Sequence, residues 1–183
     1  KRIFDLMFII LFSPLIIFLF FFTYFFCLLF NKKNIFFFQF RGGFRGKKIQ
    51  IIKFRTMETD TKKISSFNNF LRKTRLDELP QFLNVLKGDL SIVGPRPLHY
   101  EYKEIYSSYQ NKRFKVRPGL TGLAQIQNSY EMSWSDQFKI DVWYADNHNI
   151  FLDLKIIIKT LFIIIKSIKK NEIRDKEKFD GTN

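Results

Sequence analysis

The chain has 183 residues and a formal net charge of +14, with 31 lysines and arginines against 17 aspartates and glutamates. This length suits one compact domain plus an appendage, and the charge indicates anionic partners: nucleic acid, phosphorylated small molecules or an anionic membrane surface. The single cysteine, Cys27, excludes an intrachain disulfide.

The N-terminal segment is strongly apolar, because residues 6–30 contain no charged side chain. At about 1.5 Å per residue, a helix of this length can cross a hydrocarbon core of about 30 Å. A buried helix of a soluble protein is disfavoured because the run is apolar on every face, and a signal peptide because no small-residue cleavage site follows. We therefore expect residues 6–30 to insert into a membrane.

Ser13 and Pro14 interrupt this apolar run. Proline removes a backbone donor and bends a helix, while the serine hydroxyl can bond a freed carbonyl. From the run alone a single span is favoured, since proline kinks also occur in spanning helices. Bases flank both ends of the run, however, whereas a spanning helix usually has an excess of them on its cytoplasmic side.

The middle of the chain has the mixed pattern of a small α+β domain. We expect two strands at 35–40 and 47–57, joined by a turn rich in glycine and arginine. A helix should begin near Pro80 and end at Gly88. The other expected elements are a loop at 58–69, a short strand in LSIVGPRP, helices at 99–115 and over WSDQFKIDVWYADN, and a strand within RPGLTGLAQI.

A second apolar segment, residues 151–170, carries a basic stripe. Lys155, Lys159, Lys166 and Lys170 are separated by 4, 7 and 4 residues, which places them on one helical face. Two interpretations are open: a basic amphipathic helix in the interface of an anionic leaflet, or a surface helix packed on the domain core.

Asp77 and Glu78, in the stretch TRLDELPQ, form an adjacent acidic pair in this basic chain. Pro80 suits the first turn of a helix, so the pair should lie at a helix N-terminus, where free N–H groups and the helix dipole stabilise anions. The simplest interpretation is a helix cap. A joint chemical role requires a helix end, because adjacent residues do not share a helical face.

Short clusters of bases favour a chemical role for the acids. These bases are Lys53 and Arg55 in KFRTM, Arg72 and Arg75 just before the acids, Arg96 in GPRP, and Arg117 in RPGLTG. Each lies beside a glycine, a proline or a strand end, where the backbone is fixed, and arginine can hold a phosphate through two hydrogen bonds. An acid among them could bind Mg²⁺ or attack phosphorus. Together with a membrane anchor, the pattern indicates phosphoryl chemistry at a bilayer.

The stretches KFRTM, LDELPQFLNVLKGDLSIVGPRP, RPGLTGLAQ and EKFDG resemble the bacterial sugar transferase family, the small monotopic phosphoglycosyl transferases. In size and tail the chain is most similar to members that transfer diacetylbacillosamine phosphate. The resemblance implies transfer of a sugar 1-phosphate from a UDP-sugar to undecaprenyl phosphate, with Mg²⁺ as cofactor and release of UMP. This is the first membrane step of glycoconjugate or polysaccharide assembly.

The resemblance also implies roles for individual residues. Asp77 is the nucleophile that forms a sugar-phosphoryl aspartate, and Glu78 is its catalytic partner and the metal ligand. The residues implied in binding substrate phosphates are Lys53, Arg55, Arg75, Arg96 and Arg117. Asp141 is a further candidate, either for this site or as a structural partner of one of the arginines.

For the membrane segment, the resemblance favours a different arrangement from the single span that the apolar run by itself favours. Ser13 and Pro14 then mark a re-entrant helix-turn-helix over residues 1–33, which enters and leaves the cytoplasmic face of the bacterial inner membrane. Residues 34–183 form a cytoplasmic catalytic domain that includes the interfacial helix 151–170. The expected partners are the UDP-sugar, undecaprenyl phosphate and membrane lipids, and a homodimer is left open.

One segment departs from the family pattern. Members often carry Asn-Gly-Arg before Ser-Trp, whereas residues 126–134 read IQNSYEMSW, so the sugar is left open. Two alternatives to the enzyme remain. A catalytically inactive membrane scaffold of the same fold is disfavoured by the intact acidic pair. A nucleic-acid binder would explain the charge but not the apolar run, so no nucleic acid is expected as a partner.

Overall fold

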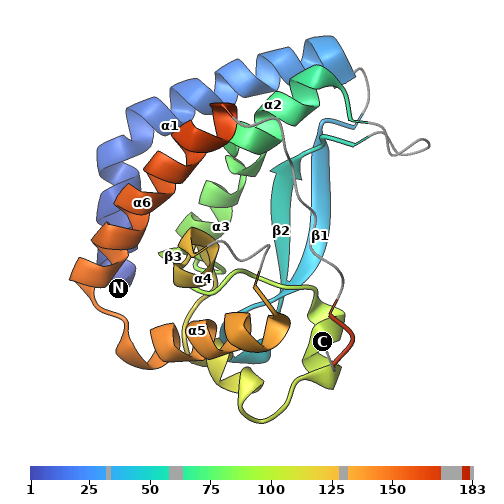
Figure 1. Cartoon of the computed structure of the whole chain (residues 1–183). Coiled ribbons are helices and arrows are strands. Elements are labelled where there is room, and N and C mark those ends of the chain that lie inside the picture. The colour runs from blue at the N-terminus through green and yellow to red at the C-terminus, as the bar shows by residue number, and fades with distance from the viewer. Residues whose placement is uncertain (32–33, 58–63, 128–131, 170–178, 182–183) are drawn as a thin grey trace.

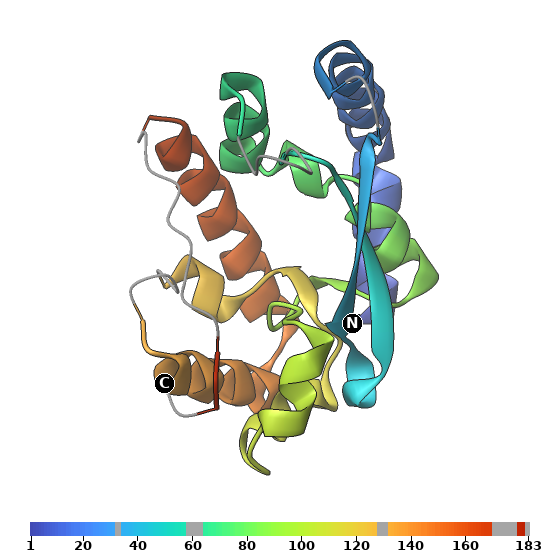
Figure 2. The same cartoon turned by 90° about the vertical axis from the view of Figure 1, so that its right-hand side faces the viewer.

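The computed structural model describes residues 1–31, 34–57, 64–127, 132–169 and 179–181. A long β-hairpin stands at one edge of the molecule, and the helices lie mainly to one side of it together with a short pair of parallel strands (Figure 1, Figure 2). The helices are α1 Arg2–Asn31, α2 Ser66–Thr74, α3 Gln81–Lys87, α4 Leu123–Ile126, α5 Trp134–Asn147 and α6 Ile150–Lys169. The strands are β1 Phe36–Gly42, β2 Lys48–Phe54, β3 Ser91–Val93 and β4 Gly119–Thr121. This mixture confirms the predicted α+β class.

The hairpin of β1 and β2 is the longest pairing of strands. Its antiparallel register runs from Phe36 opposite Phe54 to Gly42 opposite Lys48. In the turn, Arg45 has a φ of 55° and the glycine after it a φ of 69°, so two successive left-handed residues reverse the chain. The two strands and the turn predicted from the sequence are confirmed.

The parallel strands β3 and β4 bring together two motifs that are distant in the sequence. Gly94, just after β3, donates its N–H to the carbonyl of Thr121 at 2.8 Å. A Cβ on Gly119 would lie 2.1 Å from the nitrogen of Gly94, so the close approach of these backbones requires glycine. The GPRP and RPGLTG segments are thereby held side by side.

Helix α1 is continuous through its proline and bends on the way (Figure 1). Pro14 leaves the carbonyl of Ile10 without its usual backbone donor, and Ser13 Oγ donates to that carbonyl at 2.8 Å. The hydroxyl thus replaces the lost hydrogen bond, and the helix continues to Asn31. The helix-turn-helix expected over residues 1–33 is corrected to one bent helix as far as Asn31, and residues 32–33 lie outside the described residues.

Much of α1 is apolar and uncovered. By length and composition it could cross a membrane, and only 11% of its most apolar stretch is buried inside the protein. The exposed side chains include Ile10, Leu11, Phe18, Phe21 and Phe25. An uncovered apolar surface of this extent is typical of a site that contacts another apolar surface.

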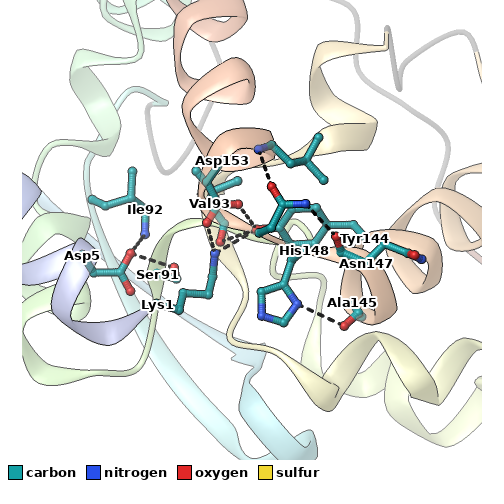
Figure 3. Close-up of polar contacts among 12 residues, drawn as sticks. Lys1, Asp5, Ser91, Ile92, Val93, Tyr144, Ala145, Asn147, His148 and Asp153 are labelled. Atoms are coloured by element: carbon teal, nitrogen blue, oxygen red, sulfur yellow. Dashed lines mark hydrogen bonds and ion pairs between the residues drawn. The ribbon is translucent and has the colours of Figure 1, made fainter.

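Both halves of α1 are nevertheless attached to the rest of the protein. In the first turns, buried Asp5 accepts hydrogen bonds from Ser91 Oγ at 2.9 Å and from the N–H of Ile92 at 3.1 Å (Figure 3). Towards the other end, Cys27 is fully buried in a cluster with Phe54 of β2. The helix therefore forms one wall of the domain and does not stand apart from it.

A buried polar cluster joins the start of α1 to α5 and α6 (Figure 3). Lys1 Nζ donates to Asp153 Oδ2 at 2.6 Å and to the hydroxyl of Tyr144 at 2.8 Å. Tyr144 in turn donates to the other carboxylate oxygen of Asp153. Burial and the neighbouring Asp153 raise the pKa of Tyr144, so its hydroxyl remains a donor.

Replacing Asp153 with alanine should lower the free energy of unfolding by about 3 kcal/mol, because it leaves the charge of Lys1, whose side chain is 19% exposed, without its counterion, while Tyr144 can still donate to the carbonyl of Val93 at 3.3 Å. Asp146→Ala is the matched control. Asp146 pairs with Lys115 at the same 2.6 Å, but their side chains are 45% and 54% exposed, so its loss should cost about 1 kcal/mol or less. Thermal unfolding in detergent measures both variants, and equal losses would contradict the stabilising role of the cluster.

Helix α6 confirms the helix expected at 151–170, except that Lys170 lies outside the described residues. One side packs on the domain: Ile156 is fully buried, and Thr160 Oγ1 lies 2.6 Å from Thr121 Oγ1. The opposite side leaves Phe151 and Phe162 exposed at 83% and 67%. The interpretation as a helix packed on the domain is therefore confirmed for one face, and the position of the other, uncovered apolar face in a membrane interface stays a prediction.

Two predicted elements were wrong for local reasons. The last four residues of the expected loop at 58–69 belong to α2, because Ser65 caps that helix by accepting from the N–H of Asn68 at 3.1 Å, whereas residues 58–63 lie outside the described residues. The expected helix at 99–115 is two short 3-10 segments. Ser107 and Gln110 exchange side chain–backbone hydrogen bonds of 2.8 and 3.2 Å, which interrupt a regular helix there.

Candidate active site

Asp77 and Glu78 lie together in a single 3-10 turn, Leu76–Glu78, between α2 and α3. Arg75, just before it, adopts a left-handed conformation with a φ of 61°, which ends α2 and turns the chain. Pro80 caps the start of α3 directly after the turn. The prediction that the acids lie at a helix start is therefore confirmed.

Three bases surround the carboxylate of Glu78. Lys53 Nζ, from β2, lies 2.6 Å from Glu78 Oε1. Arg75 Nη1 and Arg96 Nη2 each lie 3.7 Å from the same oxygen. Burial by itself raises the pKa of Glu78, but the three positive charges outweigh it and hold the pKa well below its ordinary value. Glu78 is therefore an anion at neutral pH.

Asp77 has a different electrostatic environment. Its side chain is buried, and its Oδ1 has no hydrogen-bond partner among the residues that the structure describes. Burial, followed by the negative charge of Glu78, raises the pKa of Asp77 to about 6. The opposing positive charges come from Lys53, Arg75 and Arg72. At neutral pH Asp77 is thus an ionised but poorly solvated carboxylate, which suits a nucleophile.

A small cavity adjoins Glu78. Its charged and amide-bearing lining residues are Arg41, Lys53, Glu78, Gln81 and Arg96. They come from β1, β2, the 3-10 turn, α3 and the loop after β3, so five separate segments converge on one hollow. Three cations face one carboxylate there, and this excess of positive charge favours an anionic ligand.

The structure brings together five of the predicted site residues: Lys53, Arg75, Asp77, Glu78 and Arg96. Arg55 and Arg117 instead donate hydrogen bonds to backbone carbonyls. Arg55 Nε donates to the carbonyl of Asn34 at 2.9 Å, and Arg117 Nε donates to that of Gly88 at 2.8 Å. These contacts support loops in the described conformation, and a role of the two arginines in binding phosphate stays a prediction.

Asp141 is the structural partner of an arginine, as one of the two interpretations expected, but the arginine is Arg113. Arg113 donates to Asp141 Oδ2 from Nε at 3.2 Å and from Nη2 at 2.7 Å. The same Nη2 also donates to the backbone carbonyl of Arg96 at 2.7 Å. The buried pair thus fixes the backbone that presents Arg96 to Glu78. Sequence reasoning missed Arg113 because no glycine, proline or strand end stands beside it.

Arg41 was also missed, although the sequence contained a signal for it. RGGFRG was interpreted only as a turn, but Arg41 belongs to β1 and pairs in register with Ile49. Alternate residues of a strand share a face, so Ile49, Ile51 and Lys53 lie on one side of the hairpin and Arg41 lies with them. Gln81 was missed because nothing in the helix pattern separates it from a surface glutamine.

The acidic pair also bears on the predicted Mg²⁺. Among the described residues, no group of three or more His, Cys, Asp or Glu side chains is placed to hold a metal ion. Magnesium, however, is commonly held by one or two carboxylates together with waters and substrate phosphates. Asp77, with its unpartnered oxygen, and Glu78 fit a metal that a phosphate-bearing substrate helps to hold.

A buried carboxylate beside a cluster of cations is an arrangement that favours phosphate-bearing ligands, as in phosphoryl-transfer enzymes. The bacterial sugar transferase family matches residues 1–167, and the chain belongs to that family. The resemblance drawn from KFRTM, LDELPQ, GPRP and RPGLTG is thereby confirmed, and with it the assignment to the phosphoglycosyl transferases. The divergent segment near 127–133 lies mostly outside the described residues.

Several curated relatives are similar over most of the chain. EpsL of Bacillus subtilis, described as a sugar transferase, is 43% identical over 160 residues, covering 81% of this chain and 79% of EpsL. The UDP-glucose:undecaprenyl-phosphate glucose-1-phosphate transferase of Klebsiella pneumoniae is 41% identical, covering 72% of this chain and 33% of the relative. The galactosyl transferase CpsE of Streptococcus agalactiae is 37% identical, covering 70% of this chain and 34% of the relative. The chain thus spans about a third of these two longer relatives.

Proposed function

We propose that this protein transfers a sugar 1-phosphate from a UDP-sugar to undecaprenyl phosphate and releases UMP, through a covalent sugar-phosphoryl intermediate on Asp77. The name of the Klebsiella relative supports this pair of substrates. The covalent route depends on one observation, the buried Oδ1 of Asp77, to which no donor of the described residues bonds. A carboxylate buried for structural reasons is normally hydrogen-bonded, as Asp5 is.

The reaction proceeds in two displacements at one phosphorus. First, an oxygen of Asp77 attacks the phosphorus that bears the sugar, the P–O bond to the nucleotide phosphate breaks, and UMP leaves with its electron pair. An oxygen of undecaprenyl phosphate then attacks the same phosphorus and releases the carboxylate of Asp77. An acyl phosphate is reactive enough for this second transfer, so a carboxylate suits the chemistry better than a serine would.

The surrounding bases stabilise the negative charge that develops during both displacements. Lys53, Arg75 and Arg96 are held at Glu78 before substrate arrives, so they need no reorganisation during the reaction. Mg²⁺ would be held by Glu78 and the substrate phosphates, and would neutralise the diphosphate. The strong ionisation of Glu78 keeps the cations in place and leaves Asp77 as the carboxylate available for attack.

We further propose that the protein is monotopic on the cytoplasmic face of the inner membrane. The start of α1 contacts the domain that carries the site, since Arg2 Nη2 donates to the carbonyl of Leu86 at 2.6 Å and Asp5 binds Ser91. A straight span would place Arg2 on the opposite side of the membrane from Leu86. Attachment of both halves of α1 to one domain therefore favours a helix that returns to the same face.

This topology can be tested with an impermeant thiol reagent. Ile3→Cys and Asn34→Cys, each in a Cys27→Ser background, should both resist labelling in spheroplasts and react once the inner membrane is opened. The side chain of Ile3 is 74% exposed, so the protein itself does not shield the introduced thiol and only the bilayer can protect it from the reagent. Labelling of residue 3 alone in spheroplasts would show a full span and contradict the proposal.

The reaction is tested by incubating the purified protein with undecaprenyl phosphate, Mg²⁺ and a panel of UDP-sugars that includes glucose, galactose and diacetylbacillosamine. UMP release with one of them is expected, and UDP-sugar alone should add a sugar-phosphate mass to the peptide that contains Asp77. UMP release without any such adduct would contradict the covalent route. No release with any member of the panel would favour the inactive scaffold.

A further inference from the structure

Two buried donors beside Glu78 have no hydrogen-bond acceptor. Arg41 Nε and Gln81 Nε2 are inaccessible to solvent and unpartnered within the described part of the chain. Both residues line the same cavity as Glu78, and Gln81 is only 3% exposed. A buried donor without an acceptor is energetically unfavourable, because it has lost its hydrogen bonds to water and gained none in return. Two such donors on one cavity indicate a ligand that accepts hydrogen bonds there.

The charge of Arg41 indicates that this ligand is an anion. Burial, followed by the positive charge of Arg96, lowers the pKa of Arg41 to about 10, so the guanidinium is still protonated at neutral pH. Its Nη2 donates to the neutral amide oxygen of Gln39. Glu78, the carboxylate of this cavity, is already surrounded by Lys53, Arg75 and Arg96. A phosphate oxygen would accept from Arg41 and Gln81 and supply the missing negative charge.

The location of the cavity relative to the nucleophile suits the phosphate that is not transferred. The cavity is lined by Glu78, whereas Asp77 is absent from its lining as far as the described residues go. A phosphate bound by Arg41 and Gln81 therefore lies near the nucleophile Asp77 but is not the phosphate that Asp77 attacks. Arg41 and Lys53 share one face of the hairpin, so the cavity continues into the cluster that stabilises the reacting phosphorus.

We propose that Arg41 and Gln81 form a single phosphate subsite that the reaction uses twice, first for the departing phosphate of UMP and then for the entering phosphate of the lipid. This inference depends on the proposed function. In an in-line displacement the entering and leaving oxygens lie on opposite sides of the phosphorus. Asp77 displaces UMP, and the lipid phosphate then displaces Asp77. The departing phosphate of UMP and the entering phosphate of the lipid therefore both lie on the side of the phosphorus that is opposite Asp77.

The test measures the two half-reactions separately. UMP release from UDP-sugar without lipid reports the first, and consumption of the preformed adduct by undecaprenyl phosphate reports the second. Arg41→Gln and Gln81→Leu should slow both by similar factors of about ten or more, the effect expected for a lost charged or buried hydrogen bond. Arg45→Gln is the matched control, because it removes an exposed arginine from the same hairpin; it should slow neither. Slowing of one half-reaction only, or of neither, would overturn the shared subsite.

A binding measurement separates this inference from the proposed function. Wild type and Arg45→Gln should bind inorganic pyrophosphate at least about ten-fold more tightly than Arg41→Gln, as measured by calorimetry in detergent. Arg41→Lys, which keeps the charge but not the forked geometry, should be intermediate and provides a second variant if Arg41→Gln does not fold. Absence of UMP release by the wild type would refute the function, whereas equal pyrophosphate binding by all variants would refute the subsite.

Discussion

Replacement of Asp77 by asparagine should reduce turnover by about a thousand-fold or more and abolish the sugar-phosphate adduct, because an amide cannot form the acyl phosphate. Asparagine keeps the shape of the side chain, so loss of activity will not reflect a cavity. UMP release and the intact mass after incubation with UDP-sugar measure the two effects. Turnover near that of the wild type would exclude Asp77 as the nucleophile.

The same variant should be more stable than the wild type at neutral pH. The pKa of Asp77 is raised from 3.8 to about 6 by burial and by Glu78, so folding disfavours the ionised carboxylate. This unfavourable contribution is fully present above about pH 6 and disappears as the pH falls towards 3.8. Asp77→Asn should therefore gain about 2 to 3 kcal/mol at pH 8, and the gain should vanish near pH 4. A variant that melts below the wild type at pH 8 would contradict this.

The raised pKa also predicts the pH dependence of the first half-reaction. Only the ionised carboxylate attacks phosphorus, so the rate of adduct formation should rise with pH, with a midpoint near the pKa of Asp77 of about 6. The rate is measured as UMP release in the absence of lipid. A rate that is constant across this range would show that Asp77 is ionised throughout, or that another step limits adduct formation.

Glu78→Gln should lower the turnover rate by about a hundred-fold, because it removes the charge that holds Lys53, Arg75 and Arg96 in place. It should also shift the pH midpoint of adduct formation below that of the wild type, since the charge of Glu78 raises the pKa of Asp77. Glu101→Gln, at a side chain that is 75% exposed, is the control for loss of a carboxylate.

The Mg²⁺ dependence of Glu78→Gln separates two roles of this residue. If Glu78 binds the metal, higher Mg²⁺ should restore part of the activity, because the amide is a weaker ligand than the carboxylate. If Glu78 only positions the bases, Mg²⁺ should leave the defect unchanged. Activity close to that of the wild type with an unshifted midpoint would contradict both roles.

Several elements were predictable because their signals are local. The β-hairpin follows from two strand patterns around a glycine-rich turn, and α3 follows from Pro80 at its start and Gly88, with a φ of 90°, at its end. These features depend on the conformations that a few adjacent residues prefer. The start of α2 was missed because its signal, the capping serine Ser65, lies in a polar stretch that resembles a loop.

The continuity of α1 shows a limit of local reasoning. Proline in a helix indicates a break, and the sequence contained both Pro14 and the serine beside it. Whether the chain breaks or bends depends on the geometry of one hydrogen bond, from Ser13 to the carbonyl of Ile10. The contacts of Asp5 and Cys27 with the domain, which constrain the two halves of the helix, involve residues far away in the sequence.

The sequence alone determined the chemistry of the protein: an acidic pair at a helix start, a set of bases in rigid segments and an apolar N-terminus. It could do so because motif, turn and composition are properties of neighbouring residues. Only the tertiary structure decided which bases meet the acids, placing Lys53 and Arg96 at Glu78, Asp141 on Arg113, and Arg41 with Gln81 at one cavity. These choices depend on strand register and on burial, which shift the pKa values of Asp77 and Glu78 in opposite directions although the two residues are adjacent in the chain.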